Sequence, residues 1–105
     1  MKYEKIPSKY QVGGTNMEVR RVDRCNNNSI GLCLLGAGYV EIADFFNRDS
    51  KQSDDCKVNT FYHELTHSIL DTMGEDDLSK NERFVNSFAG FLTEAMKNAY
   101  FREEE

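Results

Sequence analysis

The sequence feature that most constrains the fold is the segment His63-Glu64-Leu65-Thr66-His67, which contains both histidines of the chain. Residues four positions apart share one face of an α-helix, so a helix here presents the two imidazoles together. This H-E-x-x-H pattern is typical of helices on which two histidines bind one metal ion beside a glutamate. The alternative is a helix that carries the pattern without a metal. We favour the metal site, because a chance match in a chain of this length is uncommon.

The N-terminal half of the chain has the pattern of β-strands. Short β-branched and aromatic segments from Ile6 to about Asp44 are separated by glycine and asparagine, as in consecutive hairpins. Gly13-Gly14 and Gly36-Ala37 are suited to tight turns. The sequence therefore predicts two hairpins, with strands at residues 9–12, 15–22, 30–35 and 38–43.

A first long helix is predicted after the polar segment 47–53. Ser50 or Ser53 can cap its N-terminus, and Gly74 is suited to end it after Met73. Its apolar side chains form one broad stripe that points away from the two histidines. This stripe, which we expect to pack on the sheet, contains Val58, Phe61, Tyr62, Leu65, Ile69 and Thr72.

A second helix is predicted to begin after Ser79 and to run to about Phe101. Its face with Glu82, Asn86 and Ala89 carries small or polar groups, so we expect this face to lie toward the histidines. Its other face is a thick apolar stripe, which indicates core. The stripe contains Phe84, Val85, Phe88, Phe91, Leu92, Ala95, Met96 and Ala99.

Together these patterns predict one α+β domain over residues 1–105, a small antiparallel sheet of about three to four strands followed by two long helices.

A net charge of −5 argues against nucleic acid or an anionic membrane as a partner. Three cysteines without C-x-x-C spacing favour a reducing compartment. Residues 1–5 lack an apolar leader and no apolar run approaches membrane-spanning length, so we expect a cytoplasmic protein.

A catalytic zinc site has three protein ligands, so one ligand remains to be found beyond His63 and His67. Asp71 lies too far along a straight helix to bind the same ion, and we expect it beside the site or facing solvent. Glu82 is the stronger candidate, because an antiparallel helix pair returns it to the histidines. The competing interpretation is a capping box, in which Glu82 bonds to the backbone of Ser79.

These residues carry a resemblance to a known group. The H-E-x-x-H motif followed by a helix that begins Asn81-Glu82 resembles the gluzincin metallopeptidases, whose third zinc ligand is such a glutamate. More specifically, the segment 82–89, E-R-F-V-N-S-F-A, resembles the E-x-x-A-N-x-F-A helix of the ImmA/IrrE family. That family includes metallopeptidases that cleave repressor proteins. The resemblance covers the two helices, a little under half of the chain.

The resemblance implies a zinc-dependent peptidase in which His63, His67 and Glu82 bind Zn²⁺. Glu64 is then the general base that takes a proton from the metal-activated water, and Asn86 orients a histidine. The expected partner is a protein or peptide substrate, such as a regulatory protein, which we expect to pair with the edge of the strand near residues 39–43. The alternative is a catalytically weak or inactive zincin-like protein that binds metal and acts by binding a regulatory partner. The oligomeric state is not predicted.

Overall fold

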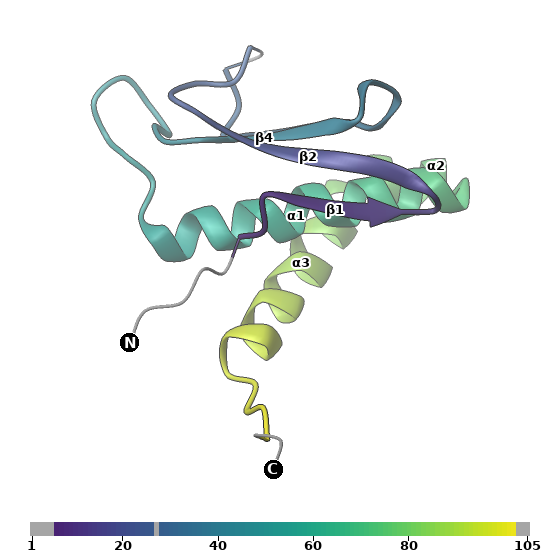
Figure 1. Ribbon diagram of the computed structural model, residues 1–105. Coiled ribbons are helices and arrows are strands. Elements are labelled where there is room, and N and C mark those ends of the chain that lie inside the picture. The colour runs from purple at the N-terminus through teal and green to yellow at the C-terminus, as the bar shows by residue number, and fades with distance from the viewer. Residues whose placement is uncertain (1–5, 27, 103–105) are drawn as a thin grey trace.

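The protein is an α+β fold in which a small sheet, a long central helix and a second long helix lie in successive layers (Figure 1). The computed structural model describes residues 6–26 and 28–102. The central helix α1 (Asp54–Met73) contacts the sheet on one side and α3 (Glu82–Lys97) on another. A short helix, α2 (Asp76–Lys80), joins the two. The predicted fold class is therefore confirmed.

The sheet has four strands in the order β1-β2-β4-β3. Both predicted hairpins are present, and in each the two strands are antiparallel. Gly13 and Gly14 turn the first one with φ angles of 54° and 83°, which glycine adopts without steric cost. The strands are β1 (Lys9–Val12), β2 (Thr15–Val22), β3 (Gly31–Leu34) and β4 (Tyr39–Ala43).

The expectation of a purely antiparallel sheet was wrong, because β2 and β4 are parallel. The connection after β2 runs to the far edge of the sheet and forms β3 there. The second hairpin then returns β4 to the middle, where it lies beside β2 in the same direction. A connection of eight residues, 23–30, thus separates β2 from β3. For the same reason β4 is a central strand, and the edge nearest the helices belongs to β3.

The core lies between the sheet and α1. Phe61 of α1 packs edge-on against Tyr10 of β1, with ring centroids 5.8 Å apart. Leu65 is partly buried against the same cluster, so the apolar stripe predicted for the first helix does face the sheet. The buried cluster consists of Ile6, Met17, Val19, Val40, Ile42, Val58 and Phe61.

The bounds of α1 agree with the sequence. Ser53 caps it by accepting a hydrogen bond from the backbone N–H of Cys56 at 3.1 Å. Gly74 ends it with φ 80°, the left-handed conformation common after a helix C-terminus. No helix within the described ranges 6–26 and 28–102 has the length and apolar character needed to span a bilayer.

The predicted second helix is present as α3, and an additional short helix, α2, precedes it. Asn81 separates them and caps α3 by accepting a hydrogen bond from the N–H of Phe84 at 3.1 Å. Ser79 is buried within α2, so its expected role as the cap was wrong. The proposed capping box between Ser79 and Glu82 is also absent, since Glu82 begins the next helix. The C-terminal end is Lys97 rather than Phe101.

The face of α3 that packs on α1 was predicted correctly, whereas the burial of its apolar stripe was predicted wrongly in part. Ala89 is 1% exposed and Thr93 donates a hydrogen bond to Asn59 of α1 at 3.1 Å, as expected for the face toward the histidine helix. The thick apolar stripe, however, is only partly core, with Val85 at 0% exposed. Phe88 and Phe91 remain 47% and 73% exposed, because α3 packs along α1 through its narrower face.

Candidate metal centre

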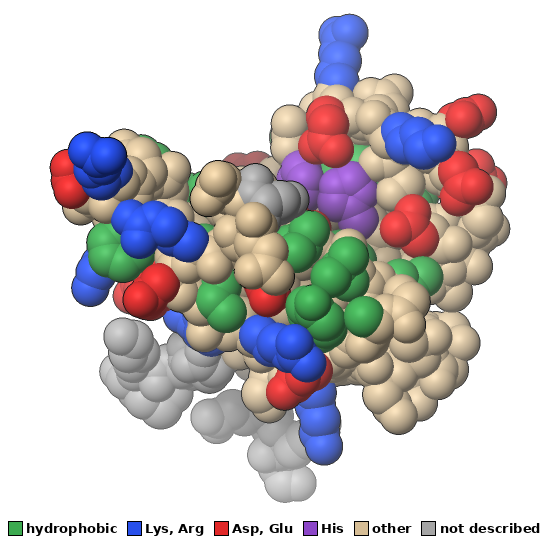
Figure 2. All heavy atoms as spheres, turned by 90° about the horizontal axis from the view of Figure 1, so that it is seen from above, with side chains coloured by type: hydrophobic (Ala, Val, Ile, Leu, Met, Phe, Trp, Pro, Cys, Tyr) green, Lys and Arg blue, Asp and Glu red, His purple; other side chains and the backbone are tan. Residues whose placement is uncertain are grey.

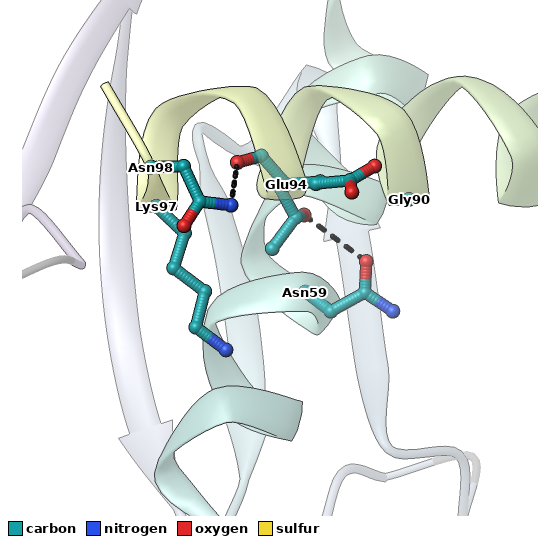
Figure 3. Close-up of a pocket in the computed structure, with 6 residues that line it drawn as sticks. Asn59, Gly90, Glu94, Lys97 and Asn98 are labelled. Carbon is teal, nitrogen blue, oxygen red and sulfur yellow. Dashed lines mark hydrogen bonds between the residues drawn. The ribbon is translucent and has the colours of Figure 1, made fainter.

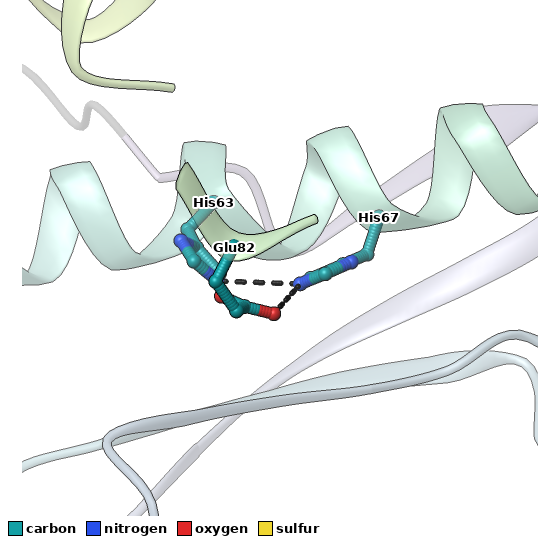
Figure 4. A group of neighbouring side chains, drawn as sticks. All are labelled: His63, His67 and Glu82. Carbon is teal, nitrogen blue, oxygen red and sulfur yellow. Dashed lines mark hydrogen bonds and ion pairs between the residues drawn. The ribbon is translucent and has the colours of Figure 1, made fainter. Parts of the chain in front are cut away.

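The two histidines project from consecutive turns of α1 toward α3 (Figure 4). α1 is a continuous helix from Asp54 to Met73. The Nε2 atoms of the two histidines lie 3.2 Å apart. Both side chains are partly exposed, at 21% for His63 and 17% for His67. They reach the molecular surface next to acidic and hydrophobic side chains (Figure 2). Two imidazole nitrogens are thus available to one bound ion.

Glu82 completes this group from the first turn of α3 (Figure 4). Its Oε1 lies 3.3 Å from Nε2 of His63, and its Oε2 lies 3.5 Å from Nε2 of His67. The break at Asn81 turns the chain between α2 and α3 and brings Glu82 back to α1. The three residues predicted as ligands therefore meet, with ligand atoms within 4.8 Å of one another.

The spacing of these donors suits a small divalent cation. Tetrahedral zinc with nitrogen and oxygen bonds of about 2.0–2.1 Å places neighbouring ligand atoms about 3.3 Å apart. The observed separations of 3.2, 3.3 and 3.5 Å agree with that value. Two imidazoles and one carboxylate are also a ligand set found in catalytic zinc sites. The residues present therefore fit the metal that the sequence pattern implies.

Each histidine has a further polar partner. Nδ1 of His67 lies 3.0 Å from Oγ of Ser79, and the side chain of Asn86 forms a hydrogen bond with His63. If Nδ1 of His67 carries the proton and donates a hydrogen bond to Oγ of Ser79, Nε2 keeps its lone pair for a metal. The expected role of Asn86 is consistent with this contact. Sequence reasoning missed Ser79, which it assigned to helix capping.

The surroundings of His63 favour its neutral imidazole. Burial lowers the pKa of His63 below its ordinary value, and the neighbouring His67 lowers it further. The Glu82 carboxylate and a hydrogen bond that His63 donates to the Asn86 side chain act in the opposite direction without reversing the shift. Metal ligation requires the neutral ring, so this environment holds His63 in the form that binds.

Glu64 is placed differently from its two histidine neighbours. Its side chain turns toward the sheet and is only 6% exposed, yet it lines the same groove as the histidines and Glu82. Burial raises the pKa of Glu64 to about 8, with a smaller contribution from the negative charge of Glu82. The groove has a volume of about 370 Å³ and is lined by Ser29, Gly31, Leu32, Cys33, His63, Glu64, His67, Asp71 and Glu82.

The opposite wall of this groove is β3. A Cβ atom added at Gly31 would lie 2.7 Å from Oε2 of Glu64 and 2.6 Å from Cγ2 of Thr60. The backbone of β3 therefore approaches the Glu64 carboxyl as closely as a residue without a side chain allows. Asp71 is exposed and lines the groove, but it is not part of the three-ligand group. This agrees with the expectation that Asp71 lies beside the site.

A second, larger groove of about 450 Å³ lies between α1 and the C-terminal half of α3 (Figure 3). Its floor is held by the hydrogen bond between Thr93 and Asn59, and Asn98 donates to the backbone carbonyl of Glu94 at 3.0 Å. Lys97 at its rim pairs with Asp55 at 2.9 Å. The Thr93–Asn59 and Lys97–Asp55 contacts join the two helices. The two histidines and Glu64 line the other groove, which is therefore the candidate site.

Comparison of the chain with models of protein families, with curated proteins and with solved structures finds no match. The functional argument therefore depends on the residues of the site themselves.

Proposed function

We propose that this protein is a zinc-dependent peptidase, in which His63, His67 and Glu82 hold Zn²⁺ and Glu64 is the general base. The observation that carries the proposal is the meeting of the three donor groups from two helices, with the Glu64 carboxyl in the same groove. Hydrolytic metal sites combine these elements: three protein ligands, an open side and an adjacent base. The resemblance of the two helices to gluzincins of the ImmA/IrrE type supports the same reading.

Zn²⁺, when bound, supplies the Lewis acidity that activates water and polarises a peptide carbonyl. Glu64 takes up the proton that the water loses and returns it to the leaving amine. The base must be ionised to do so. The positive charge of a bound Zn²⁺ would favour the carboxylate form and would thereby oppose the effect of burial on the pKa of Glu64.

The substrate in this proposal is an extended segment of a protein, such as a regulatory protein in the cytoplasm. Its support is the position of β3, which is the outermost strand of the sheet and contributes Leu32 and Cys33 to the groove. An extended peptide can add to such an edge through backbone hydrogen bonds. In this proposal the substrate backbone lies along β3, and not along β4 as we expected from the sequence.

The experiment that tests the proposal combines metal analysis with a cleavage assay. The purified protein is expected to bind one equivalent of zinc, and Glu82→Ala is expected to lose it. Glu64→Gln should keep the zinc and abolish cleavage of unfolded or regulatory proteins, whereas the exposed control Glu75→Gln should retain both. Less than about half an equivalent of metal in the wild type would contradict the metal site. Undiminished turnover in Glu64→Gln would contradict the mechanism.

A second function is favoured by one observation, the openness of the site. The Glu82 side chain is 61% exposed, so the groove offers little wall to hold a substrate. A zincin-like metal-binding protein that acts by binding a regulatory partner needs no such wall. Stoichiometric zinc without cleavage, together with equal partner binding by Glu64→Gln and the wild type, would support this second function.

A further inference from the structure

The face of α3 that points away from α1 carries a continuous aromatic surface. Phe84 and Phe88 stack with ring centroids 5.9 Å apart and an interplanar angle of 17°. Phe91 continues the row and is 73% exposed, and Ala95 extends it by one more turn. Apolar surface of this kind on a soluble domain marks an interaction site. We call the residues Phe84, Phe88, Phe91 and Ala95 the aromatic face.

The aromatic face is complementary to itself in size. When two copies of α3 lie antiparallel about an axis between Phe88 and Phe91, Phe84 of each copy lies opposite Ala95 of the other. Phe88 then lies opposite Phe91. A large side chain thus meets a small one at both ends, and the aromatic rings meet at the centre. Two-fold symmetry requires such a surface, since the same patch must fit itself.

The charges beside the aromatic face fit the same arrangement. Arg83 lies near the N-terminal end of α3 and Glu94 near its C-terminal end, both on the same flank of the aromatic face, and Glu94 also lines the groove between α1 and α3. Eleven residues of helix separate them by about 16 Å, too far for a contact within one chain. In the antiparallel pair, Arg83 of each copy lies near Glu94 of the other. The opposed helix dipoles favour this orientation as well.

We propose that the aromatic face of α3 is a homodimer interface, in which a second copy of the chain packs antiparallel about the two-fold axis between Phe88 and Phe91. Glu82 lies on the α1-facing side of the same helix and points to the histidines (Figure 4). The dimer therefore leaves the candidate metal groove open. The inference does not depend on the proposed peptidase activity.

The size of the interface sets the expected affinity. α3 has 16 residues and spans about 24 Å, so one helix face buries less than the roughly 800 Å² per partner of a standard interface. The dimer is expected to be reversible, with a dissociation constant of about 1–100 µM. Its occupancy is then set by protein concentration.

Sedimentation equilibrium of the purified chain tests the proposal over concentrations from about 1 to about 300 µM. The mass is expected to rise from 12.1 kDa toward twice that value. Phe91→Glu should weaken association more than about 30-fold, and the control Phe46→Glu, at an exposed aromatic residue outside the aromatic face, should leave it unchanged. Far-UV circular dichroism confirms that each variant is folded. A wild type that is monomeric throughout, or a dimer that Phe91→Glu leaves intact, overturns the proposal.

A charge exchange tests the antiparallel pairing. Arg83→Glu and Glu94→Arg should each weaken the dimer about three- to tenfold, because each places two like-charge pairs across the interface. The double variant Arg83→Glu/Glu94→Arg should return to within about twofold of the wild type. Because the two positions cannot touch within one chain, this recovery reports a contact between copies. A double variant as weak as the sum of the two single variants overturns the pairing.

Discussion

Nδ1 of His67 lies 3.0 Å from Oγ of Ser79, so the short helix α2 contacts one of the two histidines of the candidate metal site. Ser79 is buried, and its hydroxyl fixes which imidazole nitrogen carries the proton if it accepts from Nδ1. The free Nε2 then points at His63 and Glu82. Partners of this kind orient metal-binding histidines and raise their basicity.

Replacement of Ser79 by alanine is therefore expected to weaken zinc binding about tenfold, because the His67 ring loses its orienting partner. The measurement is competition with a chromophoric chelator. Ser79→Thr, which keeps the hydroxyl, should restore most of the affinity. The control Ser87→Ala alters an exposed serine of α3 and should change nothing. Equal affinities of Ser79→Ala and the wild type would show that the hydroxyl does not support the ligand.

The meeting of the three candidate ligands was predictable from the sequence, whereas the contact of Ser79 with His67 was not. The spacing of His63 and His67 fixes their common helix face, and a glutamate near the start of a returning helix is the natural third ligand. The segment Ser79-Lys80-Asn81-Glu82 also matches a capping box, so the pattern alone could not separate a cap from a histidine partner. The structure distinguishes the two roles because Asn81 caps α3, so Ser79 is not the cap.

The pairing of the strands and the burial of the helix faces were less predictable than the positions of the helices and strands. Hairpin signals identified four strands, but the parallel pairing of β2 with β4 follows from where the connection 23–30 leads, and no local pattern encodes that path. Part of the apolar stripe of α3 is exposed although it was predicted as core, because hydrophobic periodicity shows which residues share a helix face and does not show whether another element covers that face. Phe91 is the clearest case, since a core residue would not be 73% exposed.

Gly31 is expected to be intolerant of a side chain. Alanine there would place Cβ 2.6 Å from Cγ2 of Thr60 and 2.7 Å from Oε2 of Glu64, so β3 or α1 must shift. We expect Gly31→Ala to lower the free energy of unfolding by about 1–3 kcal/mol and to reduce cleavage more than zinc binding, because the displaced group is Glu64. Urea unfolding and the cleavage assay measure the two effects.

A second substitution separates these two clashes. Thr60→Ser removes Cγ2 and keeps the hydroxyl that donates to Gln52 at 2.9 Å. The double variant Gly31→Ala/Thr60→Ser should regain part of the lost stability, while the clash with the Glu64 carboxyl and the loss of cleavage persist. Gly36→Ala, at a glycine with open space around its Cβ position, is the matched control. Wild-type stability in Gly31→Ala would contradict the close approach.

The three cysteines are free and are expected to differ in reactivity. Burial raises the pKa of Cys33 to about 12, with contributions from Glu64 and Asp71, and raises that of Cys25 to about 11. Since the thiolate is the nucleophile, both should react slowly with iodoacetamide near pH 8. Cys56 is exposed and should react first.

Mass spectrometry of the alkylated protein is expected to show one rapid addition in the native state and three after unfolding in denaturant. Cys56→Ser should remove the rapid addition and leave the slow ones unchanged. Alkylation of Cys33 at the rate of Cys56 would show that the groove admits reagent to an ionised thiol, contrary to the burial that raises its pKa.

The ion pair between Asp44 and Lys57 gives a prediction for the pH dependence of stability. Nζ of Lys57 lies 2.8 Å from Oδ1 of Asp44 and joins the first turn of α1 to the end of β4. The hydrogen bond from Lys57 lowers the pKa of Asp44 below its ordinary value of 3.8, although desolvation opposes the shift. A carboxyl whose pKa is lower in the folded state stabilises the fold above the unfolded-state pKa, and this stabilisation is lost as the pH falls through the folded-state pKa.

Asp44→Asn is therefore expected to unfold at lower urea concentration than the wild type near pH 6, by at most about 1 kcal/mol because the pair is partly solvated. The difference should shrink once the pH falls below about 4 and vanish when Asp44 is protonated in both states. Asp49→Asn, at an exposed residue of the neighbouring loop, is the control. A difference between Asp44→Asn and the wild type that stays constant across this range would mean that Asp44 acts through its shape and backbone contacts, and that its charge contributes nothing to holding α1 against β4.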